Sequence, residues 1–180
     1  MSNNIKLEAL SIDSNIQSIQ NMLYNTLINT WEDNLDGYGR IYKNLDKNNK
    51  IKPEFYTGKG ENLEVYHNDN KAGTFFFIDD DDHKTEDGEV FTTEVKIVFM
   101  VNLKKIFPTD EERSDVKAQK NVLNILQEIS HLSFKIKNIQ KGIKNIFRGL
   151  DHSQIKFEDI SPNHCFAVLI DLSYYIDNEC

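Results

Sequence analysis

The sequence predicts an α+β fold, in which a mostly antiparallel sheet is backed by helices. Two stretches, residues 90–103 and 164–176, alternate apolar side chains with a period of two over a length that suits long strands. Three further stretches, at about residues 14–31, 110–130 and 139–148, repeat apolar side chains every three or four residues, as amphipathic helices do. We expect these helices to lie on a sheet that contains both strands.

The composition is that of an acidic globular protein. Hydrophobic residues make up 39% and charged residues 28% of the 180 residues, which is enough to bury the core of a single domain, residues 1–180. The formal charge of −8 disfavours tight, non-specific docking on nucleic acid or on an anionic membrane. No apolar run approaches the roughly 20 residues of a membrane span. Cys165 and Cys180 form no zinc or redox motif, so we expect folding in a reducing, cytosolic environment.

The first predicted helix, residues 14–31, opens with a capping-box pattern of Ser14 and Gln17. Its apolar stripe consists of Ile16, Ile19, Leu23 and Leu27. We expect this stripe to face the sheet. The opposite face of the helix is polar but uncharged, which suits either solvent or a neighbouring subunit.

Residues 32–73 carry no sustained period and are predicted to form a long irregular arm or hairpin. Loops of this length are uncommon inside compact domains, and disordered linkers lack the aromatic residues found here. The favoured interpretation is an ordered arm that packs on a partner, and the alternative is a meander folded on its own domain. Gly37, Gly39, Gly58 and Gly60 are attributed to turns. The expected oligomer-interface residues are Tyr38, Ile41, Tyr42, Phe55, Tyr56, Val65 and Tyr66.

Residues 90–103 are the predicted central strand. One of its faces is apolar throughout, whereas the other begins with polar residues such as Glu94 and Lys96 and ends with Val98 and Met100. The second face should therefore start in solvent and finish beneath an apolar cover, either a helix of the same chain or a neighbouring subunit. We expect this strand to pair with the final strand or to lie near it.

An acidic run precedes the central strand and is predicted to lie in a hairpin loop after a short strand at residues 74–78. It consists of Asp79, Asp80, Asp81 and Asp82. The four carboxylates repel one another, which favours a solvated turn. A calcium-binding loop would need acidic residues at alternating positions and a glycine bend, and the run has neither.

The second predicted helix, at about residues 110–130, begins with another capping-box pattern, Thr109 and Glu112. Residues 134–137 alternate briefly and are predicted to form an edge strand protected by its lysines. The third predicted helix, at about residues 139–148, follows directly.

No motif indicates catalysis, a cofactor or a metal site, so we expect no enzyme activity. The five histidines lie in different predicted elements and lack the spacing of metal ligands. One basic concentration is interleaved with apolar residues, and we interpret it as a solvated face in preference to a nucleic-acid site. It consists of Lys135, Lys137, Lys141, Lys144 and Arg148.

Three stretches carry a resemblance to a known group of proteins: residues 40–66, residues 75–103 and residues 165–175. The first contains Arg40-Ile-Tyr and Glu64-Val-Tyr, and the second leads from three phenylalanines through the acidic turn into the central strand. Their order resembles the small ring-forming proteins at the head–tail interface of tailed bacteriophages, the tail-terminator, tail-completion and neck-connector group.

The resemblance implies a virion structural protein, assembled in the host cytoplasm, with no catalysis and no cofactor. It implies a homo-oligomeric ring of roughly six or twelve subunits that joins the portal or connector to the tail. DNA would pass through the ring without specific binding, and we expect Asp79 to Asp82, or acids within residues 32–36, to line the channel. The alternative is an acidic bacterial protein-interaction module, immunity-like or adaptor-like, that caps a basic partner. An enzyme is the third possibility.

Overall fold

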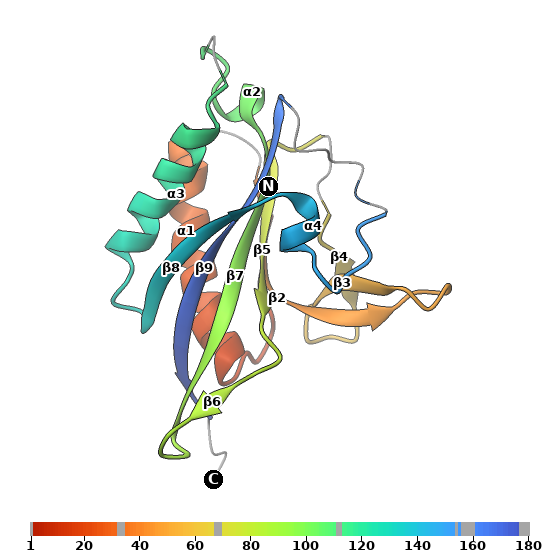
Figure 1. Ribbon diagram of the computed structural model, residues 1–180, viewed down its shortest axis with the longest axis vertical. Coiled ribbons are helices and arrows are strands. Elements are labelled where there is room, and N and C mark those ends of the chain that lie inside the picture. The colour runs from red at the N-terminus through yellow and green to blue at the C-terminus, as the bar shows by residue number, and fades with distance from the viewer. Residues whose placement is uncertain are drawn as a thin grey trace.

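A computed structural model of the protein describes residues 2–31, 35–66, 70–110, 113–153, 155 and 161–176. One mixed sheet forms its centre, with long helices on one face and a single helical turn on the other (Figure 1). The helices are α1 (Ile12–Trp31), α2 (Leu103–Ile106), α3 (Asp115–Glu128) and α4 (Ile143–Ile146). The strands are β1 (Ser2–Asn4), β2 (Leu35–Leu45), β3 (Ile51–Tyr56), β4 (Asn62–Glu64), β5 (Gly73–Asp79), β6 (Lys84–Thr85), β7 (Val90–Asn102), β8 (Phe134–Lys141) and β9 (Asn163–Tyr175). These elements confirm the predicted α+β class.

The main path of the sheet runs β4-β3-β2-β5-β7-β9-β8. Neighbours on this path are antiparallel, except for β2 and β5, which are parallel. β1 pairs in parallel with β2, and β6 pairs antiparallel with β7. The β2–β3 hairpin and the edge strand β8 therefore lie toward opposite ends of the strand order.

β7 and β9 form the long central pair. They are antiparallel along their whole length, from Val90 opposite Tyr175 to Asn102 opposite Asn163. A period of two along both strands sends successive side chains to the two faces of the sheet. The prediction that the two long strand patterns share one sheet and pair with each other is confirmed.

Helices α1 and α3 cover one face, which we call the helix-covered face (Figure 1). The fully buried residues of the α1 stripe are Ile16, Ile19, Leu23 and Leu27, as their spacing predicts. On the sheet side of this core, the ring of Phe99 stacks on Phe166 at a centroid distance of 4.9 Å and on Phe75 at 5.7 Å. The helix layer and the central strands thus share one continuous apolar core.

The opposite face is covered only in part, and we call it the partly covered face. Val98 and Met100 of β7 are fully buried there in a second core that includes Phe147, just after α4. Glu94 and Lys96, nearer the start of β7, are only half-buried. This face therefore starts in solvent and finishes beneath the chain's own α4 segment, which decides between the two covers that the sequence allowed.

The segment predicted as a long irregular arm or hairpin is part of the sheet, which contradicts the irregular arm and agrees with the hairpin and with the alternative of a meander folded on its own domain. β2 pairs first with β5 and then with β3, and β3 pairs with β4. Ile41, Phe55 and Val65, expected at a subunit interface, are 4%, 1% and 0% exposed in the second core. The interface prediction is wrong for these three residues, because their own sheet buries them. The turn between β2 and β3 extends away from the body as a hairpin (Figure 1).

Gly37 and Gly39 are strand residues, although the sequence suggested turns. A Cβ atom on Gly37 would lie 2.8 Å from the ring of Phe75, and one on Gly39 would lie 3.0 Å from the ring of Phe55. A larger residue at either position would displace an aromatic ring of the core. These glycines therefore allow β2 to approach its neighbours closely.

The helix predicted at residues 139–148 is wrong in its first part. Strand β8 continues to Lys141, and α4 follows as one turn after Gly142. Gly142 has a φ of 87°, in the left-handed region, which separates the strand from the turn. The predicted edge strand at residues 134–137 is confirmed as part of β8.

The first predicted capping box does not form. Helix α1 begins at Ile12, before Ser14, and Gln17 Oε1 instead accepts a hydrogen bond of 2.7 Å from the Lys6 N–H. The helix predicted at about residues 110–130 is α3, which begins at Asp115. Glu112, which belongs to the second predicted capping box, lies outside the described residues.

Candidate functional site

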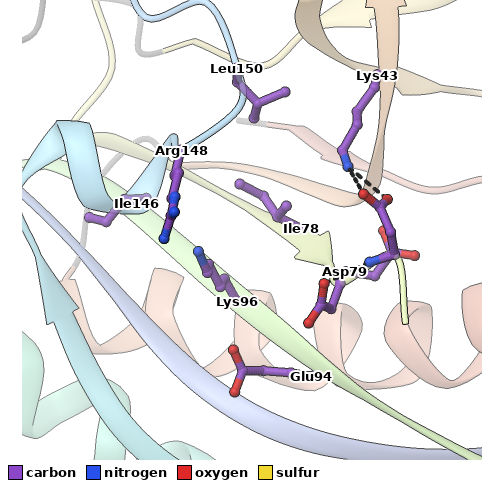
Figure 2. A pocket seen from close by; sticks show the side chains of 10 residues that line it. Lys43, Ile78, Asp79, Glu94, Lys96, Ile146, Arg148 and Leu150 are labelled. Atoms are coloured by element: carbon purple, nitrogen blue, oxygen red, sulfur yellow. Dashed lines mark hydrogen bonds and ion pairs between the residues drawn. The ribbon is translucent and has the colours of Figure 1, made fainter. Parts of the chain in front are cut away.

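A pocket opens on the partly covered face, where β5 and β7 pass beneath the chain segment that follows α4 (Figure 2). Its volume is about 230 Å³, below the ~300–1,000 Å³ typical of sites for drug-sized ligands. It therefore suits a small chemical group. The lining residues are Lys43, Ile78, Asp79, Asp80, Asp81, Glu94, Lys96, Ile146, Arg148 and Leu150.

Two carboxylates of the pocket have a lysine partner. Asp81 Oδ2 lies 2.6 Å from Lys43 Nζ, and Glu94 Oε2 lies 3.0 Å from Lys137 Nζ. Lys137 also lies 3.3 Å from Asp171 Oδ1, across the exposed end of the sheet. These ion pairs neutralise two of the four carboxylates that line the pocket.

Among the described residues, Lys96 and Arg148 are cations of the pocket without such a partner. Lys96 rises from β7, where its register neighbours are Ile78 of β5 and Leu169 of β9. Arg148 reaches down from the segment after α4, and Figure 2 shows the two side chains pointing toward each other. Within the parts of the chain that the structure describes, neither side chain forms an ion pair or a hydrogen bond.

A second polar cluster, the Asp13 network, joins α1 to β2. Asp13 is 7% exposed and accepts hydrogen bonds from Arg40 Nε at 2.6 Å, from Tyr42 OH at 2.9 Å and from Lys6 Nζ. Arg40 Nη2 and Lys6 Nζ also donate to the Tyr42 hydroxyl, at 3.1 and 2.7 Å. These groups satisfy one another, so the cluster acts as a tie between the helix layer and the sheet.

The charges in the Asp13 network stabilise each other. Burial alone would raise the pKa of Asp13, but hydrogen bonds from Arg40 and Lys6 outweigh burial and hold this pKa below its usual value. Burial would lower the pKa of Lys6 and of Arg40, but their contacts with Asp13 raise both. All three groups therefore stay charged near neutral pH.

Asp79 links the Asp13 network to the acidic turn. Its Oδ2 lies 3.1 Å from Arg40 Nη1 and 3.4 Å from His83 Nε2, and its side chain is 17% exposed. His83 Nδ1 lies 2.6 Å from the hydroxyl of Tyr174, and burial raises the pKa of that hydroxyl. Asp79 thus holds the start of the acidic turn against the end of β9.

The other residues expected to line a DNA channel differ in exposure. Asp80, Asp81 and Asp82 are exposed, as the prediction of a solvated turn requires. Asp79 does not suit a solvated channel lining, because it is paired within the chain. Asp36, in the second acidic stretch considered, is 8% exposed and lies 3.2 Å from Lys71 Nζ, and residues 32–34 lie outside the described part.

The β2–β3 hairpin carries an exposed apolar pair next to its turn. Leu45 and Ile51 lie directly opposite each other, and they are 68% and 38% exposed. Asp46 orders the turn, because its Oδ1 accepts hydrogen bonds from the backbone N–H groups of Asn48 (2.8 Å) and Lys50 (2.9 Å). A hydrogen-bonded turn thus presents two apolar side chains to solvent.

The four tyrosines of the expected interface are half-buried and have contacts within the chain. Tyr66 OH donates a hydrogen bond of 2.7 Å to the Asp151 carbonyl, and the Tyr56 ring lies 6.3 Å from that of Tyr42. Burial raises the pKa of Tyr38 to about 12. A part of each tyrosine is accessible, so their role in subunit contact stays a prediction.

Neither a metal cluster nor a membrane-spanning helix occurs in the described parts of the chain. No group of three or more His, Cys, Asp or Glu side chains is placed there to hold a metal ion. No helix among these residues is long and apolar enough to cross a membrane. Cys165 is a buried residue of β9, and Cys180 lies outside the described residues.

Sequence reasoning missed both the Asp13 network and the approach of Lys96 to Arg148. The sequence assigned Lys96 to the solvated half of a strand and Arg148 to a solvated basic face, and each assignment describes one residue alone. A signal for the network was present, because Asp13 is the one charged residue in the sequence of α1. A carboxylate in the first turn of a helix is favourable by itself, so this signal was weak; only the burial of Asp13 in the fold requires partners from another element.

Comparisons with known proteins give no relative for this chain: no family model, curated protein or solved structure matches it. The residues and the geometry described above are therefore the grounds on which a function can be proposed.

Proposed function

We propose that the protein is a non-enzymatic structural component of a tailed-phage virion that forms a ring at the head–tail interface. The observation that carries the proposal is the apolar pair Leu45 and Ile51 on the β2–β3 hairpin, which extends away from the sheet (Figure 1). Two large apolar side chains held in solvent by an ordered turn suit a surface that a neighbouring subunit covers.

The strand order supports a head-to-tail contact between subunits. The β2–β3 hairpin lies toward one end of the strand order, and β8 forms the other end. When one surface of a subunit meets a different surface of the next, the contact is heterologous, and it closes into a ring if the rotation allows. The element order resembles that of head–tail ring proteins, and this resemblance implies a ring of roughly six or twelve subunits around DNA.

Native mass spectrometry of the purified protein tests the proposal. We expect a large homo-oligomer, and we expect the double substitution Leu45→Lys and Ile51→Glu to convert it to monomers without loss of folding. Because the two positions face each other across the hairpin, the introduced charges can pair and preserve it. Val116→Lys is the matched control, since Val116 on α3 is also 68% exposed.

A ring that persists in the double variant would contradict the role of the hairpin. A wild-type protein that is monomeric or dimeric would favour the second candidate, an acidic interaction module that caps a basic partner. The exposed acidic turn supports this second candidate, because Asp80, Asp81 and Asp82 all face solvent. For that module, the test is salt-sensitive binding of a basic partner that weakens when these three residues become Asn.

A further inference from the structure

We propose that Lys96 and Arg148 form a binding site for a single oxyanion group, a phosphate or a carboxylate, in the pocket of the partly covered face. The proposal rests on where the two cations come from, on the surfaces around them and on the pairing of the neighbouring carboxylates. It is independent of ring formation, because it concerns one chain alone.

The two side chains approach the pocket from different walls. Lys96 stands on the sheet, and Arg148 belongs to the segment that passes above it (Figure 2). Phe147, the residue before Arg148, is fully buried and fixes this segment on the sheet, with its ring 6.0 Å from that of Phe76. The backbone that carries Arg148 is therefore held in place above the sheet.

The surroundings of Lys96 are apolar for a lysine. Its neighbours across the strands are Ile78 and Leu169, and Leu169 is 5% exposed. Ile146, which is 1% exposed, lines the same pocket. Lys96 is half-buried, so reduced contact with water strengthens its attraction for an anion, whereas Arg148 is exposed and its charge is screened by solvent.

Three of the four carboxylates that line the pocket, among the described residues, are paired elsewhere. Glu94 is bound by Lys137, Asp81 by Lys43, and Asp79 by Arg40 and His83. Asp80 is exposed, and its Oδ1 accepts a hydrogen bond of 2.8 Å from the Asp81 N–H. Among the residues that the structure describes, Lys96, Arg148 and Asp80 are thus the charged groups of the pocket lining without an ion pair, and a bound oxyanion would neutralise the positive charge that remains.

The size of the pocket limits the ligand. A volume of about 230 Å³ accommodates one phosphate or carboxylate group with a short attachment. Such groups accept hydrogen bonds from both side chains. The arginine guanidinium donates directional hydrogen bonds, and the lysine ammonium acts as a point charge.

Two-dimensional ¹H–¹⁵N NMR titrations of the full chain test the proposal, with sodium phosphate and sodium acetate as probes. Ionic strength is held constant with sodium chloride, so that general screening does not change. We expect saturable shifts confined to the amides near Lys96 and Arg148 for at least one probe. The probe that binds more tightly identifies the group as phosphate or carboxylate.

Lys96→Gln and Arg148→Gln should each weaken binding by about tenfold or more, because each removes charge-assisted hydrogen bonds to the anion. Lys144→Gln is the matched control: Lys144 lies on α4, is exposed and does not line the pocket. It should leave the affinity unchanged. Thermal melting of each variant verifies that it folds, and the use of two variants keeps the test valid if one does not.

The proposal is overturned if neither probe gives saturable shifts at constant ionic strength. It is equally overturned if shifts spread over lysines of the whole surface, or if both pocket variants bind as tightly as the control. The two pocket variants can lose anion binding while the ring stays intact, and the hairpin variant can lose the ring while anion binding stays intact. Either result separates this site from the proposed assembly function.

Discussion

The helix-covered face and the partly covered face use the same central strands but differ in how far their cover extends. On the first, α1 and α3 bury aromatic residues such as Phe75, Phe99 and Phe166. On the second, α4, the segment after it and residues 41–65 bury one end of β7 and leave Glu94 and Lys96 half-buried at the other. The first face therefore contributes mainly to the stability of the fold, whereas the second leaves room for a binding pocket.

The largest effect should come from Phe99→Ala on the helix-covered face. Loss of a fully buried ring that stacks on two others should cost about 3–5 kcal/mol of unfolding free energy. Phe147→Ala on the partly covered face should cost less, because the short α4 segment can settle into the space left by the ring. Urea denaturation measures both free energies, and an equal or larger loss for Phe147→Ala would contradict the difference between the faces.

Asp13→Asn should have the next largest effect, since the Asp13 network ties the helix layer to the sheet. We expect a loss of about 2 kcal/mol, the scale of hydrogen bonds to a charged group. Asp81→Asn is the control, because Asp81 also pairs with a lysine but its side chain is 84% exposed. Exposed ion pairs contribute little, so denaturation midpoints should separate the two variants clearly.

Asp13 should also make stability depend on pH. Its pKa is held below the usual value of 3.8 in the folded chain, so the unfolded chain binds the proton more readily. The stabilisation is therefore complete well above pH 4 and is lost as pH falls through the lowered pKa. The difference in melting temperature between wild type and Asp13→Asn should shrink on acidification. A difference that widens would contradict the lowered pKa of Asp13 in the folded chain.

The smallest effect on stability should come from Lys96→Leu in the pocket. The change removes repulsion from Arg148 and adds an apolar side chain between Ile78 and Leu169, so we expect stability within about 0.5 kcal/mol of wild type, or slightly higher. A large loss would show that Lys96 serves the fold and not a ligand. The same denaturation measurement decides this point.

The elements that the sequence predicted correctly carry their burial in a regular period. β7 and β9 alternate over their full length, and the stripe of α1 repeats at helical spacing, so local pattern and tertiary burial agree. Residues 35–66 lack such a period, because their buried residues stand between glycines and charged residues whose role depends on neighbouring strands. Gly37 and Gly39 are informative only once the rings of Phe75 and Phe55 are in place.

The candidate site was less predictable than the fold. Lys96 was correctly expected on the polar half of its strand, but its relation to Arg148 depends on α4, and the sequence extended a helix across that turn. Gly142 changes the direction of the chain there, with a φ of 87°. Two side chains from distant parts of the chain can be brought together in this way without any local signal.

The pairing of β7 with β9 also bears on how the chain is made. β5 pairs with β7 through a local hairpin. Val90 of β7, however, can pair with Tyr175 of β9 only after α3 and β8 have been synthesised. Such distant pairing is slow, because a long intervening chain must close before any contact forms. During translation, the nascent chain therefore presents an apolar strand with one open edge, and this interval is when it is most vulnerable to aggregation.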